Sequence, residues 1–224
     1  MNRTLSLILA IILALCLLVG VVGGTYAYFS DAETSNDNHM TAGTLDLVSL
    51  VSGSYSGDSS LYSVTVGGNG INGYVAFNRI LPGETGTIKW VISNTGNTPG
   101  TFTISATCTF DENGSNEPES AIPSNNTGGN GDLDEYLKVT LQRGVGADQS
   151  SAEAALSYIL GSSGTPVAMS GLEAVLDAQS LTLGASGGND TIVYVLTWSL
   201  PDHPLINIVQ SDTAEIDITF SLIQ

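Results

Sequence analysis

Two segments alternate strictly between apolar and polar residues, and this period of two constrains the fold more than any other feature of the sequence. Between Thr101 and Phe110, the apolar positions are Phe102, Ile104, Ala106, Cys108 and Phe110. Between Glu215 and Leu222, they are Ile216, Ile218, Phe220 and Leu222. Because successive side chains of a β-strand point to opposite faces, the pattern predicts two strands that are each buried on one side.

Six further segments are rich in β-branched and aromatic residues, which favour strands. They are residues 44–51, 61–66, 74–80, 87–93, 136–142 and 192–199. Turn-forming residues separate them, for example Pro82-Gly83 and Gly67-Gly68-Asn69-Gly70. Eight short strands in one chain predict an all-β fold. We expect a jelly-roll-like two-sheet β-sandwich over residues 43–224.

Two stretches before the predicted penultimate strand have a helical composition instead. Residues 151–160 and 169–176 are rich in Ala, Leu and Glu, and the first carries an apolar stripe made of Ala155, Leu156, Ile159 and Leu160. We expect two short helices here, packed over one end of the sandwich. Residues 111–134 show no apolar periodicity and predict a long polar loop.

The N-terminus has the layout of a secretory signal. Arg3 precedes an almost unbroken apolar run over residues 5–22, and small residues follow the run. We expect residues 1–27 to be a signal peptide that is cleaved after Ala27, which leaves residues 28–42 as a free N-terminal segment. The run is also long enough to stay as a membrane helix, and Cys16 could carry a lipid. No Lys/Arg cluster follows the run, which argues against a retained membrane helix. Leu15 precedes Cys16, which argues against a lipid anchor. Both observations favour cleavage.

The charge of the chain excludes one class of partner. The chain has 22 acidic and 5 basic residues, a formal net charge of −17. A surface of this charge repels phosphate backbones. We therefore expect no nucleic-acid partner.

Residues able to carry out catalysis are sparse. The two histidines, His39 and His203, are far apart in the sequence, and no His-Glu-x-x-His motif is present to hold zinc. No Gly-x-Ser-x-Gly motif is present either. Cys108 lies on a predicted buried face, where a thiol is inert. The sequence predicts that the protein is not an enzyme and has no cofactor other than, at most, calcium.

The acidic surplus suggests two kinds of surface site. Carboxylates gather at the end of the polar loop, and calcium binds such hard oxygen ligands; the candidates are Asp132, Asp134 and Glu135. A plain solvated acidic loop is the simpler interpretation. Three Asn-x-Ser/Thr triplets match the acceptor pattern for N-glycosylation, at Asn113, Asn125 and Asn189.

Three groups of residues, in order, resemble a known family. The first runs from Gly23 through Tyr28-Phe29-Ser30-Asp31 to Ala42-Gly43-Thr44-Leu45-Asp46-Leu47. The second joins residues 81–86 (LPGETG) to residues 92–97 (ISNTGN), and the third is the ending, residues 207–224. Together they resemble the TasA/camelysin family of exported fibre proteins. The resemblance is weakest across residues 111–179.

The resemblance implies a jelly-roll subunit that polymerises outside the cell. Family members build biofilm matrix fibres in bacteria and bundling pili in archaea. The implied joint is donor-strand exchange, in which the freed N-terminal segment of one copy completes the sheet of the next. Here the donor is residues 28–42, with apolar side chains at Tyr28, Phe29, Ala32 and Met40. The implied partner is the chain itself, as a head-to-tail homopolymer that also bundles laterally.

Two other functions compete with the filament subunit. A monomeric cell-surface adhesin or carbohydrate-binding module would use exposed aromatic residues such as Tyr55, Tyr62 and Tyr74. A secreted metalloprotease is suggested by descriptions of camelysin members. The sequence shows no ligand set for that activity, so the activity is not carried over to this chain.

Overall fold

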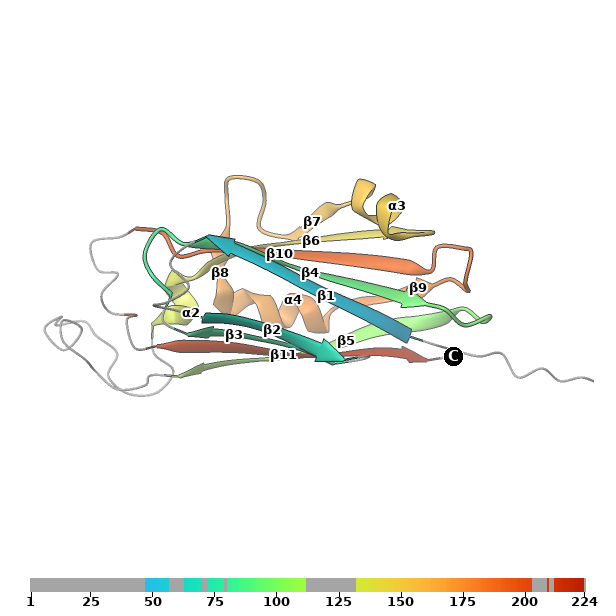
Figure 1. The fold of residues 1–224 in the computed structure, drawn as a ribbon, viewed down its shortest axis with the longest axis horizontal. Coiled ribbons are helices and arrows are strands. Elements are labelled where there is room, and N and C mark those ends of the chain that lie inside the picture. The colour runs from blue at the N-terminus through green and yellow to red at the C-terminus, as the bar shows by residue number, and fades with distance from the viewer. Residues whose placement is uncertain are drawn as a thin grey trace, which may run out of the picture. The chain divides into compact units, whose positions relative to one another are not determined.

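The computed structural model describes residues 47–56, 63–69, 72–78, 80–111, 132–202, 209 and 212–223. The chain divides into two units between Ala42 and Gly43, and all the described residues lie in the second unit. They form two antiparallel sheets, which we call sheet A and sheet B. Figure 1 shows the two sheets as layers. The predicted all-β sandwich is confirmed.

Sheet A has six strands. Their order is β1 (Leu47–Ser56), β4 (Thr85–Asn94), β10 (Thr191–Ser199), β6 (Lys138–Gly146) and β7 (Ser157–Leu160), with β8 (Val167–Ala168) also paired to β6. Sheet B has five strands, in the order β2 (Ser63–Asn69), β3 (Asn72–Asn78), β11 (Thr213–Ile223), β5 (Gly100–Asp111) and β9 (Ser180–Leu183). Strands that are distant in the sequence therefore lie side by side in both sheets.

The alternating segments bury the faces that their sequences predict. In β5, Phe102, Ile104 and Ala106 are buried, and burial decreases toward Phe110. In β11, Ile216, Ile218 and Phe220 are buried. These side chains share one core with the inward residues of β4 and β10, so the two sheets pack face to face.

Aromatic rings join the two sheets. The ring of Phe77 on β3 meets Trp198 on β10 edge to face, with ring centroids 5.4 Å apart. Phe102 on β5 stacks on Tyr194 of β10 with centroids 6.4 Å apart. A Cβ atom at Gly86 would lie 2.5 Å from the Trp198 ring, so the glycine leaves the space that the indole fills. This packing explains the glycine that closes the LPGETG segment.

The helical segments are short. They are α2 (Leu133–Tyr136), α3 (Gln149–Ala154), the 3-10 helix η2 (Met169–Gly171) and α4 (Leu172–Asp177). Helix α3 packs on the outer face of sheet A, where Ala152 meets Val91 and Val193. The glycine at 144 permits this approach, because a Cβ atom there would overlap the Ala152 carbonyl oxygen. Helix α4 instead adds Leu172 and Leu176 to the core between the sheets.

The prediction of one helix over residues 151–160 is wrong in its second half. Helix α3 ends at Ala154, and residues 157–160 form β7, which pairs with β6. Tyr158 and Ile159 favour a strand, and pairing with the edge of β6 outweighs the helical stripe. The prediction that both helices cover one end of the sandwich is also wrong. Helix α3 lies outside sheet A, whereas α4 contacts β5 and β7 at the side.

The other differences concern boundaries and short strands. All eight predicted strands are present, but β2 runs on through the predicted glycine turn to Asn69, and β6 begins at Lys138 and not at Tyr136. The predicted polar loop is interrupted at its end by α2. Strands β7, β8 and β9 were not predicted, because they are only two to four residues long. Segments this short carry no readable period.

Candidate functional site: the sheet edges

One side of sheet B is closed by a helix. Strand β9 pairs with β5 only from Gly100 to Thr103. Beyond that point, the Asp177 carboxylate accepts a hydrogen bond from the Ala106 backbone N–H at 2.7 Å. The Glu173 carboxylate accepts one from the Cys108 N–H at 2.8 Å. Helix α4 thus occupies backbone donors that an incoming strand would need, which is one way of protecting a sheet edge.

The opposite side of the sandwich presents a long strand at the edge. Strand β1 pairs with β4 along ten residues, from Leu47↔Asn94 to Ser56↔Thr85, and with no second strand among the described residues. Its sequence, LVSLVSGSYS, has no charged residue and no proline. Charges and prolines are common protections of edge strands. We call the free side of β1 the open edge.

Strand β2 lies beside the open edge. It is the terminal strand of sheet B, as β1 is of sheet A, and the two strands contact each other. The residues of the predicted donor segment, Tyr28, Phe29, Ala32 and Met40, lie outside the described residues, as do His39 and His203. Their roles stay predictions. The described part of the chain supplies only the edge that such a segment could join.

The LPGETG segment holds a turn together. Glu84 is buried, and its carboxylate accepts a hydrogen bond from the Leu81 N–H at 2.9 Å. Gly83 adopts a φ of 82°, which favours glycine, and its N–H donates to the Leu200 carbonyl at 2.7 Å. These bonds anchor the start of β4 to the end of β10. The segment therefore has a structural role.

The ISNTGN segment anchors the other end of β4. Asn94 is 1% exposed, and its amide donates to the carbonyl oxygens of Thr98 and Gly184, both at 2.8 Å. Its side-chain oxygen accepts from the Gly96 N–H at 3.0 Å. One buried amide thus organises two loops. The sequence shows the motif but not these contacts.

A polar cluster lies inside the sandwich next to α4. Arg143 on β6 donates to the Gln179 side-chain oxygen at 2.8 Å, and the Tyr194 hydroxyl donates to the same oxygen at 3.4 Å. Gln179 in turn donates to the Val175 carbonyl at 2.8 Å. Burial raises the pKa of Tyr194, and the nearby Arg143 charge opposes the rise. The alternation of β6 places Arg143 on the same face as Val139 and Leu141, but the sequence does not predict the cluster, because its other members, Gln179 and Tyr194, come from distant segments.

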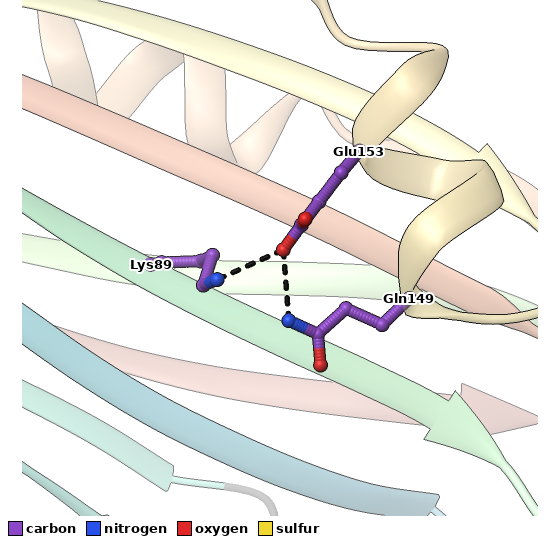
Figure 2. A network of polar contacts seen from close by, with 3 residues as sticks. All are labelled: Lys89, Gln149 and Glu153. Atoms are coloured by element: carbon purple, nitrogen blue, oxygen red, sulfur yellow. Dashed lines mark hydrogen bonds and ion pairs between the residues drawn. The ribbon is translucent and has the colours of Figure 1, made fainter.

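A second polar network fixes α3 on sheet A (Figure 2). The Lys89 ammonium and the Gln149 amide both donate to the Glu153 carboxylate, each at 2.8 Å. The hydrogen bond from Lys89 lowers the pKa of Glu153 below its ordinary value. Asp148 caps the helix by accepting from the Ser151 N–H at 2.7 Å, which lowers the pKa of Asp148.

The calcium candidates lie at helix α2. The N–H groups of Asp132 and Leu133 donate to the Asp212 carboxylate at 2.6 and 3.0 Å. Burial raises the pKa of Asp134, and the adjacent Glu135 charge raises it further. No group of three or more His, Cys, Asp or Glu side chains suited to a metal occurs in the described ranges. A calcium site here stays a prediction.

Of the glycosylation candidates, the structure describes only Asn189. It is exposed, and its backbone carbonyl accepts from the Gly184 N–H at 2.8 Å in the loop before β10. Asn113 and Asn125 lie outside the described residues. Of the proposed sugar-binding tyrosines, Tyr55 belongs to β1, Tyr62 lies outside the described residues, and Tyr74 is half-buried on β3. Its pKa is raised by burial and by the hydrogen bond to Glu215.

Cys108 provides a direct test of the structure around α4. Burial raises the pKa of its thiol to about 12, and the charges of Glu173 and Asp177 contribute. At pH 9, about one thiol in a thousand is then ionised in the folded chain, against most of them in the unfolded chain. In the chain without residues 1–27, where Cys108 is the sole cysteine, we expect alkylation by iodoacetamide to be at least about 100-fold slower in buffer than in urea. Similar rates in both would contradict the structure.

No helix in the described segments is long and apolar enough to cross a membrane. The candidate membrane span at residues 5–22 lies outside these segments.

Comparison with known proteins gives one family match. Residues 3–52 match the family described as camelysin metallo-endopeptidase, and this stretch includes the first residues of β1. The match agrees with the resemblance of the N-terminal motif to the TasA/camelysin family, whose proteins are exported. No curated protein matches the chain.

Among solved structures, one of the matches has a low similarity to this chain. It is the enzymatically active domain of tailspike protein 4 from bacteriophage CBA120, with a TM-score of 0.32 and 12% sequence identity. The alignment covers 77% of this chain and 19% of the tailspike chain, so this chain spans about a fifth of that structure.

Proposed function

We propose that the chain is a secreted structural subunit of an extracellular filament, either a biofilm matrix fibre or a bundling pilus. The observation that carries the proposal is the open edge: a ten-residue uncharged strand that follows closely after residues 28–42. The family match over residues 3–52 supports export and covers this same stretch. The edge of β5 on the other side is occupied by α4, so the open edge is the better site for a joining strand.

The proposed joint is donor-strand exchange. Residues 28–42 of one copy add to the open edge of the next, so that main-chain hydrogen bonds supply affinity. The apolar side chains of Tyr28, Phe29, Ala32 and Met40 supply the register. Each copy gives one segment and offers one edge, so the contact is head to tail and does not close. The product is a linear homopolymer.

Removal of the donor segment is expected to abolish the filament. The mature chain, residues 28–224, should form filaments in negative-stain electron microscopy, and the variant that lacks residues 28–40 should not. A synthetic peptide of residues 28–42 should then bind the truncated variant with one-to-one stoichiometry in calorimetry, because the variant retains the open edge. Filaments from both proteins would refute donor-strand exchange, and monodisperse particles from both would refute the filament.

A metallo-endopeptidase is the competing function, because the matching family carries that description. The filament proposal expects no stoichiometric zinc in the purified chain and no proteolysis. A metallo-endopeptidase would instead contain bound zinc, and its proteolytic activity would be lost in His39→Ala or His203→Ala. Metal analysis of the mature chain separates the two. A monomer that binds sugars and tolerates the loss of residues 28–40 would support the adhesin.

A further inference from the structure

The charged residues of the strands are segregated between the two sheets. The six strands of sheet A contain three cations and no carboxylate: Lys89 and Lys138, which lie on the outer face, and Arg143, which points inward. The five strands of sheet B contain three carboxylates and no cation: Asp111, Glu215 and Asp217. In a chain with 22 acidic and 5 basic residues, a sheet with cations and no acids is unexpected.

The part of the outer face of sheet A that helix α3 leaves uncovered is rich in hydroxyl groups. One row of residues in lateral register crosses four strands and consists of Ser54, Thr87, Thr197 and Thr140. Lys138 lies in the next row, beside Ser199. A shallow depression of about 390 Å³ is lined by Ser52, Gly53, Ser54, Thr87, Lys89 and Val195. Its one described carboxylate neighbour is Glu153 of α3, which pairs with Lys89.

The outer face of sheet B has hydroxyl groups and carboxylates. Across β5, β11 and β3, one row consists of Thr107, Asp217 and Tyr74, and the next consists of Thr109, Glu215 and Ala76. Asp217, Thr107 and Thr109 are exposed. Asp111 extends the same face at the end of β5. No cation of a sheet B strand balances these carboxylates in the described residues.

We infer that the outer face of sheet A of one copy docks on the outer face of sheet B of a second copy. The charges of the two faces favour this pairing: two B faces would bring carboxylates together, and two A faces would offer Lys138 no carboxylate beyond Glu153, which already pairs with Lys89. At physiological ionic strength the Debye length is about 8 Å, so charges that meet across the contact act while the remaining acidic charges are largely screened. The short Ser and Thr side chains beside α3 allow the two faces to approach closely.

This contact goes beyond the proposed joint through residues 28–42. It uses two different surfaces, so it is heterologous and open, and it can repeat from copy to copy. In a filament, it would join neighbouring filaments side by side. It does not require the N-terminal segment, so its test is separate from that of the filament.

The first test places a carboxylate on the outer face of sheet A, where no strand residue carries one. Thr197 is exposed at the centre of sheet A, and Thr197→Glu should raise the concentration for side-by-side association of mature chains about five- to tenfold at 0.15 M salt. The control Ala174→Glu adds the same charge at an exposed position of α4 and should associate like the unaltered chain. Light scattering measures the association, and electron microscopy counts bundles against single filaments. Equal association in the three proteins, or equal loss in both variants, would overturn the inference.

A charge exchange supplies the second test. Lys138→Glu alone and Asp217→Lys alone should each weaken association, and the double variant should restore it in part, because the two exchanged side chains again bring opposite charges to the two faces. No recovery in the double variant, with melting curves that show all three variants folded, would overturn the pairing of these faces.

Cross-linking tests directly which faces of two copies meet, and it does not require filaments. With a short bismaleimide, a mixture of Thr197→Cys and Thr107→Cys chains should give covalent dimers, and either variant alone should give several-fold fewer. The native Cys108 should react slowly with the maleimide, because the pKa of its thiol is raised. Equal dimer yields in the mixture and in the separate variants would refute docking of unlike faces. If filaments are absent but the mixture cross-links, the filament proposal fails and the face pairing stands.

Discussion

Replacing Trp198 by alanine is expected to lower the free energy of unfolding by about 3–5 kcal/mol. Trp198 is 1% exposed and belongs to the core that both sheets share. Its ring meets Phe77 of the other sheet edge to face and fills the space above Gly86. The substitution leaves a cavity in that space and removes an aromatic contact between the sheets, a contact of a kind that contributes about 0.5–1.5 kcal/mol. Urea unfolding monitored by circular dichroism measures the change.

Two controls separate packing from strand propensity. Thr197 is the exposed neighbour of Trp198 in β10, so Thr197→Ala should change stability by less than about 1 kcal/mol. Trp198→Phe keeps a ring and removes an indole N–H that has no hydrogen-bond partner among the described residues, so it should cost less than Trp198→Ala. A cost of Trp198→Ala no greater than that of Thr197→Ala would show that Trp198 is not an inter-sheet contact.

Much of the sandwich could be predicted because burial on one side of a strand leaves a period of two in the sequence. Phe102, Ile104, Ile216 and Ile218 follow that period, and all four are buried. Strand β7 could not be predicted, because residues 157–160 are stabilised as a strand by pairing with β6, which lies more than ten residues earlier in the sequence. Helix α3 itself depends on Gly144, where a side chain would clash with the helix backbone.

The candidate site was less accessible to sequence reasoning. The residues proposed to join copies, such as Tyr28 and Phe29, were found by family resemblance, and the structure does not describe them. The open edge depends on the strand order of sheet A. Strand β1 pairs with β4 on one side only, so it is a terminal strand of the sheet. The same strand order brings Lys89 and Lys138 to one face. No local sequence pattern predicts this shared face, because β4 and β6 are joined only through β10. Strand β10 lies more than forty residues after β6 in the chain.

The double variant Glu173→Ala, Asp177→Ala is expected to open the protected edge of sheet B. Both carboxylates accept hydrogen bonds from β5, so their removal leaves the N–H groups of Ala106 and Cys108 without these acceptors. The unfolding free energy should fall by about 1–3 kcal/mol, toward the low end because Asp177 is exposed. Association through the freed edge should appear as larger species in sedimentation.

The matched control for this edge is Glu173→Gln, Asp177→Asn, which removes the charges and keeps the oxygen acceptors. Both double variants remove two charges that raise the pKa of Cys108, so both should label faster with iodoacetamide than the unaltered chain. Only the alanine variant also loosens α4 and reduces the burial of the thiol, so it should label fastest and associate most. If the alanine and amide variants behave alike in sedimentation and in labelling, the carboxylates act on β5 through their charge alone, and α4 does not protect the edge by hydrogen bonding.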